Sequence, residues 1–278
     1  MIGILAAAAI AAASPASPPA SAPAIASRAN NADPAIYVVR DADTTIYLFG
    51  TFHALDSKTE WFNDQVKVAF EKSDELVLET LLPEGPPKPL ALKVPPAPPV
   101  ALRMPVASSA SFLATTRMAI SAGRSQGMQV GNGADMVLRH IAEGEGKPVE
   151  GLESLQSQLN MFNRMPPAAP PAVALPGTPV GNAASMDSLQ KAMAEMQSAW
   201  KHGDQSVFVR MLGQIERSSP DTYRMMFVER NKHFAEWIAT RMHKPGTVFV
   251  AIGAGHLAGK DSVLVRLAER GIESSRVN

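Results

Sequence analysis

Two histidines stand in the same short pattern, far apart along the chain. One closes "YLFGTFH" at His53 and the other closes "FVAIGAGH" at His256. In each case a β-prone apolar run stops at a glycine, Gly50 or Gly253, and the histidine follows three positions later. Glycine permits a turn with an unusual φ and a close backbone approach, so we treat both glycines as supporting residues. The pattern predicts that both imidazoles stand at the carboxyl ends of strands, where open α/β sheets bind ligands.

Two carboxylates end other predicted strands. Glu79 closes "ELVLE" and Glu153 closes "KPVEGLE". Two neutral imidazoles with one or two carboxylates suit Zn, Mn, Co or Fe and leave positions open for water. The residues therefore predict a metal site made by His53, His256 and Glu79, with Glu153 in support. The alternatives are a structural, hydrogen-bonded role for each histidine and, for Glu153, a charge that favours the start of a helix.

Polar residues also fall on the apolar face of a predicted long helix that starts at Ser219-Pro220. Proline suits the first turn of a helix. By spacing of three and four residues, Arg230 and Asn231 lie on the apolar stripe of this helix rather than opposite it. A buried arginine and a buried asparagine need partners. A site anion, a metal-bound water or a substrate carbonyl would serve, and so would a structural salt bridge.

The elements that must position these residues follow from hydrophobic periodicity and from Pro and Gly breaks. The pattern predicts a β-hairpin, β-α-β units that imply parallel pairing with right-handed crossovers, and a largely helical stretch before the last strand. The predicted strands are 36–40, 45–49, 75–79, 148–152 and 247–252, and the predicted helices are 60–72, 134–143, one after 153, several over 186–242, and 261–269. We therefore predict an α/β fold with a mixed, largely parallel central sheet and flanking helices.

A stripe of apolar side chains marks the start of the helical stretch. Leu189, Met193, Met196 and Trp200 recur at spacings of four, three and four residues. Such stripes are typical of helix faces that pack on a core. We predict a core role for this stripe rather than contact with a cofactor.

The first 27 residues have the composition of a leader sequence. Residues 1–27 carry no charged side chain and combine an apolar run with small-residue pairs that suit a cleavage site. A secretory signal peptide is the first interpretation, and a disordered Ala/Pro leader is the alternative. Residues 28–278 then form a single domain, with Pro-rich insertions near 82–111 and 166–185 where continuous helix or central strand is disfavoured. The mature protein is expected to be secreted or periplasmic.

Composition excludes several classes of partner. The 278 residues are 46% hydrophobic, and Lys+Arg and Asp+Glu both number 26. This balance gives no electrostatic footprint for nucleic acid, and the leader is too short to span a membrane comfortably. We therefore expect no nucleic-acid partner and no transmembrane anchor in the mature chain. Because the chain has no cysteine, it can form neither a disulfide nor a thiolate metal site.

Several separated motifs, taken in order, resemble the TraB/GumN family, which also includes the Tiki metalloproteases. They are "YLFGTFHAL", "ELVLET", "GADMVLRHIAEGEGKPVEGLESLQSQ", "AWKHGD", "ERNKHFAEWI" and "FVAIGAGHLAGKDSVLVRLAERGI", and they cover about residues 36–278 apart from the Pro-rich stretches. The resemblance places the family's paired motifs on Gly50–His53 and Gly253–His256, its acidic residue on Glu79, and its Arg-Asn pair on Arg230 and Asn231. It implies two pseudo-repeated halves, each with a strand–GxxH–helix unit, in a fold related to the erythromycin esterase and ChaN-like group.

The resemblance also implies a divalent-metal hydrolase site. The leading hypothesis is a secreted metal-dependent hydrolase, most simply a peptidase acting on a peptide or protein. His53 and His256 would bind Mn, Co or Zn, and Glu79 would be a third ligand or the general base. Arg230 and Asn231 would steady an oxyanion or a substrate carboxylate. The alternative is a non-catalytic envelope protein that holds haem or a metal, or an accessory factor for polysaccharide export. Metal identity, substrate and oligomeric state stay open at this point.

Overall fold

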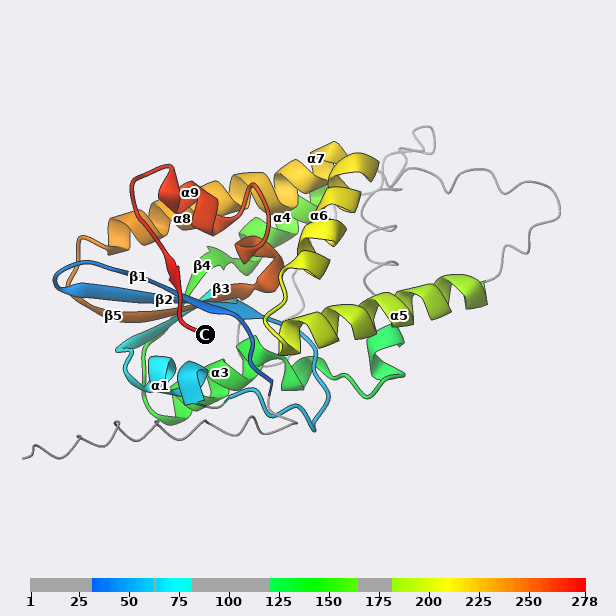
Figure 1. Ribbon diagram of the computed structural model, residues 1–278, viewed down its shortest axis with the longest axis horizontal. Helices are drawn as coiled ribbons and strands as arrows, with labels where there is room; N and C mark the ends of the chain where they lie inside the picture. Colours follow the sequence, from blue (N-terminus) through cyan, green and yellow to red (C-terminus); the bar gives the residue numbers. More distant parts are fainter. Residues whose placement is uncertain (1–31, 63, 82–120, 165–181) are drawn as a thin grey trace, which may run out of the picture.

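The computed structural model describes residues 32–62, 64–81, 121–164 and 182–278. Within these residues one sheet carries the fold, with its strands in the order β4-β3-β5-β2-β1-β6 (Figure 1). The strands are β1 (Ile36–Arg40), β2 (Thr44–Thr51), β3 (Glu75–Leu81), β4 (Val149–Ser154), β5 (Gly246–Gly253) and β6 (Ser275–Arg276). The neighbours β4, β3, β5 and β2 are parallel, whereas β1 pairs antiparallel with β2 and with β6. The predicted mixed, largely parallel α/β sheet is confirmed.

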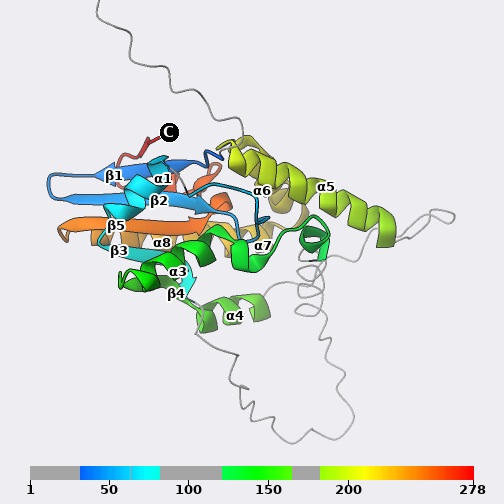
Figure 2. The ribbon, with the colours of Figure 1, turned by 90° about the horizontal axis from the view of Figure 1, so that it is seen from below.

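Helices flank the sheet on both faces. They are α1 (Asp64–Glu71), α3 (Ala134–Gly144), α4 (Leu155–Arg164), α5 (Asn182–Lys201), α6 (Ser206–Ser218), α7 (Pro220–Tyr223), α8 (Glu229–Arg241) and α9 (Val263–Ala268). Short 3-10 turns lie at η1 (Val130–Asn132) and η3 (Ala254–Leu257), and a π-helical turn, η2 (Arg224–Val228), joins α7 to α8. In Figure 1, α8 and α9 lie above the sheet and α1 and α3 lie below it, and in Figure 2, which is seen from below, α1 and α3 lie in front of the strands.

Side chains of the central strand β5 point alternately to the two faces of the sheet and pack against the helices on each face. On β5, Val248, Val250 and Ile252 pack into the cluster that contains α8 and α9, while Phe249 and Ala251 pack into the cluster that contains α1 and α3. All five side chains are at most 1% exposed. A parallel strand that is covered on both faces needs such a continuous apolar run. The continuous apolar run that predicted a strand at 247–252 therefore reflects the central position of β5 in the sheet.

Aromatic rings anchor the helical stretch to the sheet. The Trp200 ring on α5 lies 6.0 Å from that of Trp61 and 6.3 Å from that of Phe49, centroid to centroid. Its indole Nε1 donates a hydrogen bond of 2.7 Å to the carbonyl oxygen of Gly50. The predicted core role of the α5 stripe is thus right for Trp200. Met193 and Met196 also pack against the core, as predicted, and in addition they line a cavity.

Other differences from expectation are local. The strand β6 was not predicted, because two exposed residues carry no periodic signal. Helix α5 begins at Asn182, inside the stretch 166–185 that was predicted to be an insertion, and no proline follows Pro179 there to oppose the helix. The predicted leader at 1–27, the insertion at 82–111 and residues 166–181 lie outside the described residues. Within the described part of the chain, no helix is long and apolar enough to cross a membrane.

Candidate functional site

The carboxyl ends of four neighbouring parallel strands form the site. In the order β4-β3-β5-β2, these strands lead to Glu153, Glu79, His256 and His53. The register brings the ends level, since Thr80 pairs with Glu153 and Thr51 pairs with Gly253. Residues separated by about two hundred positions therefore meet at one edge, because parallel strands end together.

The two motif glycines are required for close packing rather than for an unusual φ. Neither of them has a positive φ, which corrects the expectation of an unusual φ, whereas the expected close backbone approach is found at Gly50. A Cβ added at Gly50 would lie 3.1 Å from the Cα of Ala254, because the turn η3 passes directly over it. A Cβ added at Gly253 would lie among the side chains of the site, as described below.

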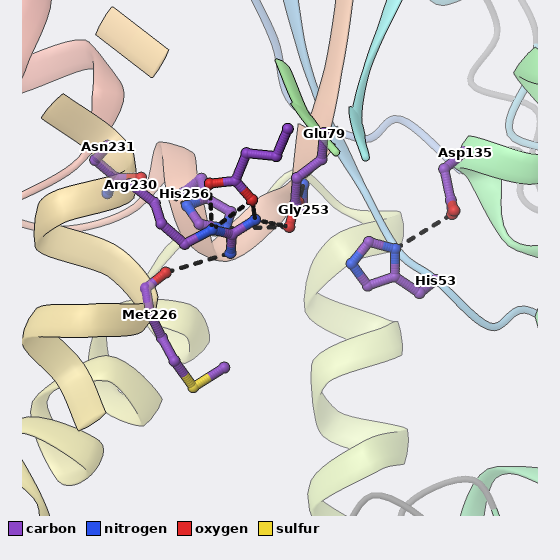
Figure 3. A network of polar contacts seen from close by, with 9 residues as sticks. His53, Glu79, Asp135, Met226, Arg230, Asn231, Gly253 and His256 are labelled. Atoms are coloured by element: carbon purple, nitrogen blue, oxygen red, sulfur yellow. Dashed lines mark hydrogen bonds and ion pairs between the residues drawn. The ribbon is translucent and has the colours of Figure 1, made fainter. Parts of the chain in front are cut away.

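The Glu79 side chain is 13% exposed, and each of its carboxylate oxygens accepts a hydrogen bond. Its Oε1 accepts a hydrogen bond of 2.6 Å from Nη2 of Arg230, and its Oε2 accepts one of 2.8 Å from the backbone N–H of Gly253 (Figure 3). Burial alone raises the pKa of Glu79, but His256, Arg230 and His53 lower it by more, so the pKa lies well below its ordinary value. Glu79 is therefore a carboxylate at any pH near neutrality.

Arg230 uses all five of its N–H donors inside the protein. Nε donates to both carboxylate oxygens of Glu153 at 3.0 Å, and Nη2 donates to Glu153 and to Glu79. Nη1 donates to the carbonyl oxygen of Met226 at 3.3 Å and faces Nε2 of His256 at 3.1 Å. A guanidinium has five donors and no acceptor, so none remains for a substrate. Of the partners weighed from the sequence, the structure shows the salt bridge.

His256 is fixed at both ring nitrogens. The Nδ2 of Asn231 donates to the carbonyl oxygen of Asp261 at 2.7 Å, so the Oδ1 of Asn231 faces Nδ1 of His256 at 2.6 Å. Because an amide oxygen only accepts, Nδ1 of His256 carries the proton, and Nε2 is the acceptor for Arg230. Asn231 is 1% exposed and lies behind His256. The geometry gives Asn231 the task of orienting His256.

His53 is the exposed histidine of the pair. Its Nδ1 lies 3.3 Å from Oδ1 of Asp135, and its side chain is 60% exposed. Figure 3 shows its other nitrogen on the side that faces the Glu79 and Arg230 group. Asp135 was not predicted from the sequence as a site residue. The available signal was an aspartate in the first turn of a helix, which occurs in many helices with no site.

The pairing with Asp135 changes the pKa of His53. Desolvation lowers this pKa, but the hydrogen bond and the charge of Asp135 raise it by more, to about 9. Since the folded-state pKa exceeds the unfolded value of 6.5, the pair stabilises the fold fully below pH 6.5, and this contribution is lost as the pH rises through about 9.

We therefore predict that Asp135→Asn lowers the melting temperature of the metal-free protein more at about pH 6 than at about pH 9.5. The charge attraction that the substitution removes exists only while His53 is protonated. Differential scanning calorimetry of both proteins with a chelator present measures the two differences. A difference that stays constant between these pH values would contradict the prediction.

The space above Gly253 is where the site converges. A Cβ built on Gly253 would lie 3.2 Å from Oε2 of Glu79, 3.2 Å from Nε2 of His53 and 3.7 Å from Cδ2 of His256. Both histidine rings thus border one small space, together with a carboxylate oxygen. An imidazole nitrogen and a carboxylate oxygen are donors that suit Zn, Mn or Co. The donor chemistry therefore fits a divalent ion, although in the described residues no three His, Asp or Glu side chains form a ready-made metal group.

Gly253→Ala tests this space without disturbing the backbone. The φ of −51° and ψ of 136° at Gly253 suit alanine, but its methyl group must push His53 or Glu79 aside by a few tenths of an ångström. We expect metal affinity to fall by roughly 10- to 100-fold, the scale of a disturbed ligand arrangement, with the far-ultraviolet circular dichroism unchanged. Isothermal titration calorimetry measures the affinity.

Gly144→Ala is the matched control, because a Cβ at Gly144 meets nothing within 4 Å. It should bind metal as the wild type does. Equal metal affinity of the two variants would show that no ion occupies the space over Gly253.

A cavity of about 520 Å³ opens from the site. His53, Glu79, Arg230 and His256 lie at its polar end, and apolar side chains from α4, α5, α6 and η2 form most of the rest. These apolar residues include Phe52, Met128, Met161, Phe162, Met193, Met196, Phe208, Met211, Met226 and Phe227. A mostly apolar cavity with a few convergent polar groups is the usual form of a ligand site. The sequence did not predict this wall, since a methionine on a helix face reads as core.

The fold and the site define an α/β protein with paired histidines and a carboxylate at the carboxyl edge of a parallel sheet. A family model described as the TraB/PrgY/gumN family matches residues 35–96 and 99–276. The chain belongs to this family, as its motifs suggested. Comparisons with curated proteins and with solved structures gave no significant match.

Proposed function

We propose that the protein is a divalent-metal-dependent hydrolase that cleaves peptides or proteins. The observation that carries the proposal is the convergence of His53 Nε2 and Glu79 Oε2 on one space above Gly253, at the opening of an apolar cavity. We place the enzyme outside the cytoplasm, as a secreted or periplasmic protein, because residues 1–27 resemble a signal peptide.

Each polar residue has a distinct task in this proposal. His53 and Glu79 would hold the ion, and His256, whose Nε2 accepts a hydrogen bond from Arg230, would join them only if that bond were given up. A bound Mn, Co or Zn would lower the pKa of a water enough for it to attack a carbonyl carbon. The low pKa of Glu79 favours the ligand role over that of general base, because an efficient base has a pKa near the working pH. Glu153 shares the charge of Arg230, and each oxygen of Glu79 accepts one hydrogen bond, so Glu79 keeps lone pairs with which it would bind a second cation.

Arg230 and Asn231 hold other side chains of the site in place rather than contacting the substrate. Arg230 fixes Glu79, Glu153 and Nε2 of His256, since all of its donors are engaged there. Asn231 fixes the tautomer of His256 through Nδ1. This assignment replaces the direct contact with an oxyanion that we expected from the sequence.

The cavity supports a substrate with an apolar portion next to the reacting bond. Methionine side chains are unbranched and polarizable, so a methionine wall adapts to differently shaped apolar groups. Six methionines line this cavity. A peptide with bulky apolar side chains would bury them there while its carbonyl group lies near Glu79 and His53.

Elemental analysis combined with a peptide-library assay tests the proposal. The purified protein should contain a divalent metal or bind one added as Mn, Co or Zn, and cleavage products should appear with the metal and disappear with a chelator. Preferred sites should be flanked by apolar residues. A protein that binds none of these ions and cleaves no peptide would overturn the proposal.

A non-catalytic haem-binding protein is the second candidate. The apolar Met and Phe wall with a histidine nitrogen at its polar end favours it, because haem combines an apolar macrocycle with an iron that binds imidazole. Addition of haem to the purified protein separates the two functions. A Soret band that shifts on binding and is lost in His53→Ala supports haem binding, whereas metal-stimulated cleavage supports the hydrolase.

A further inference from the structure

The side chain of Asp135 lies behind His53, on the side away from Glu79 and Arg230 (Figure 3). Its Oδ1 is 3.3 Å from Nδ1 of His53, and its side chain is 27% exposed. We propose that Asp135 is a positioning residue that holds the proton of neutral His53 on Nδ1 and thereby directs the Nε2 lone pair into the space above Gly253. A carboxylate oxygen accepts hydrogen bonds, so it selects the nitrogen that carries the proton.

Backbone contacts fix Asp135 relative to His53. The N–H of Ala134 donates a hydrogen bond of 3.0 Å to the carbonyl oxygen of Phe52. Gly133 lies so close to the loop that an added Cβ would overlap the carbonyl oxygen of His53. The start of α3 thus packs against the residues that follow β2. These backbone contacts fix the distance between the Asp135 carboxylate and the His53 ring.

Asp135 contacts Nδ1 of His53, on the opposite side of the ring from the other charged groups of the site (Figure 3). Glu79 and Arg230 lie on the Nε2 side of His53 (Figure 3), but both oxygens of Glu79 already accept hydrogen bonds, from Arg230 and from the Gly253 N–H. The His53 ring has its hydrogen bond with Asp135, through Nδ1. Free imidazole favours the proton on Nε2, which would block the donor atom. Asp135 reverses this preference, as carboxylates do for the histidine ligands of metal sites.

Nuclear magnetic resonance of the metal-free protein reads this tautomer directly. Histidine labelled with nitrogen-15, in protein with chelator at about pH 10, above the His53 pKa of about 9, distinguishes protonated from unprotonated ring nitrogens. We expect protonated Nδ1 on His53 in the wild type and protonated Nε2 in Asp135→Ala. His53→Gln identifies the signal. A wild-type ring that is protonated on Nε2 overturns the proposal, even if the variant does not fold.

Metal affinity is the second readout, and this part rests on the proposed function. Calorimetric titration with Zn, Mn and Co should show roughly 10- to 100-fold weaker binding in Asp135→Ala, the usual cost of losing such a partner. Asp221→Ala is the matched control, because Asp221 also lies in the first turn of a helix but pairs with Arg224. The control should keep wild-type affinity.

The two readouts separate the two ideas. If no protein binds metal while the tautomer changes as expected, the proposed function fails and the role of Asp135 stands. If the metal binds equally well to the wild type and to Asp135→Ala and the tautomer does not change, Asp135 has no positioning role. Weaker binding together with an unchanged tautomer also overturns the proposal, because the charge of Asp135 alone would then account for the loss.

Discussion

Glu79→Gln is expected to reduce metal-dependent peptide cleavage by about 10²- to 10⁴-fold, the scale on which enzymes respond to loss of a central acid–base or ligand group. Glutamine keeps the shape of the side chain, and its one oxygen can accept from either the Gly253 N–H or Nη2 of Arg230, so one of these two hydrogen bonds is lost. It removes the negative charge that would bind the ion. Initial rates on the best library peptide at saturating metal, together with calorimetric metal affinity, measure the effect.

The variant should still fold, and the structure gives the reason. Arg230 keeps a second carboxylate, Glu153, which holds it through both Nε and Nη2. The guanidinium is therefore not stranded when Glu79 loses its charge. Glu150→Gln is the control, because Glu150 is an exposed residue of β4; it should leave activity unchanged. Full activity of folded Glu79→Gln would make Glu79 a bystander of the reaction.

Arg230→Gln is expected to lower stability more than any other single change at the site. It would leave two carboxylates, Glu79 and Glu153, with side chains that are each only 13% exposed, and without their common cation. Breaking a buried ion pair by removing one partner costs roughly 3–5 kcal/mol. For a protein of this size, that corresponds to a fall in melting temperature of roughly 6–20 °C. Thermal denaturation followed by circular dichroism measures the shift.

A second substitution separates the charge effect from lost packing. Adding Glu153→Gln to Arg230→Gln removes one of the stranded charges, so the double variant should melt at a higher temperature than Arg230→Gln alone. Arg210→Gln is the control, since Arg210 and Glu195 form an exposed pair with 61% and 57% of their side chains accessible; such pairs contribute less than about 1 kcal/mol. If Arg230→Gln melts within 2 °C of the wild type, the buried network is not a source of stability.

The strands and their chemically active ends could be predicted from local sequence. The runs that became β2, β3 and β5 are apolar on both faces and stop at a Gly or Glu, because central parallel strands are covered by helices on both sides. Parallel strands end at one edge, so the meeting of His53, Glu79 and His256 followed from the α/β pattern alone. These inferences needed only periodicity, chain direction and the position of each break.

The partners of the polar residues depended on the tertiary structure. Helical spacing predicted that Arg230 is buried. Its partners Glu79 and Glu153 lie 151 and 77 positions away along the chain, so only the tertiary structure shows that Arg230 binds them rather than a substrate. Asp135 lies 82 positions from His53, and nothing local links them. A hydrogen bond is set by a few tenths of an ångström and by its direction, which periodicity does not encode.

The tertiary structure also determined which residues line the cavity. Sequence spacing placed Met193 and Trp200 on one face of α5, and both follow the same apolar rule. Only the packing of α5 against the sheet buries Trp200 over Gly50 and leaves Met193 beside an open space. Hydrophobicity determines that a side chain leaves bulk water. Whether it then touches other side chains or borders a cavity is a question of volume, and the volume between elements exists only once they are assembled.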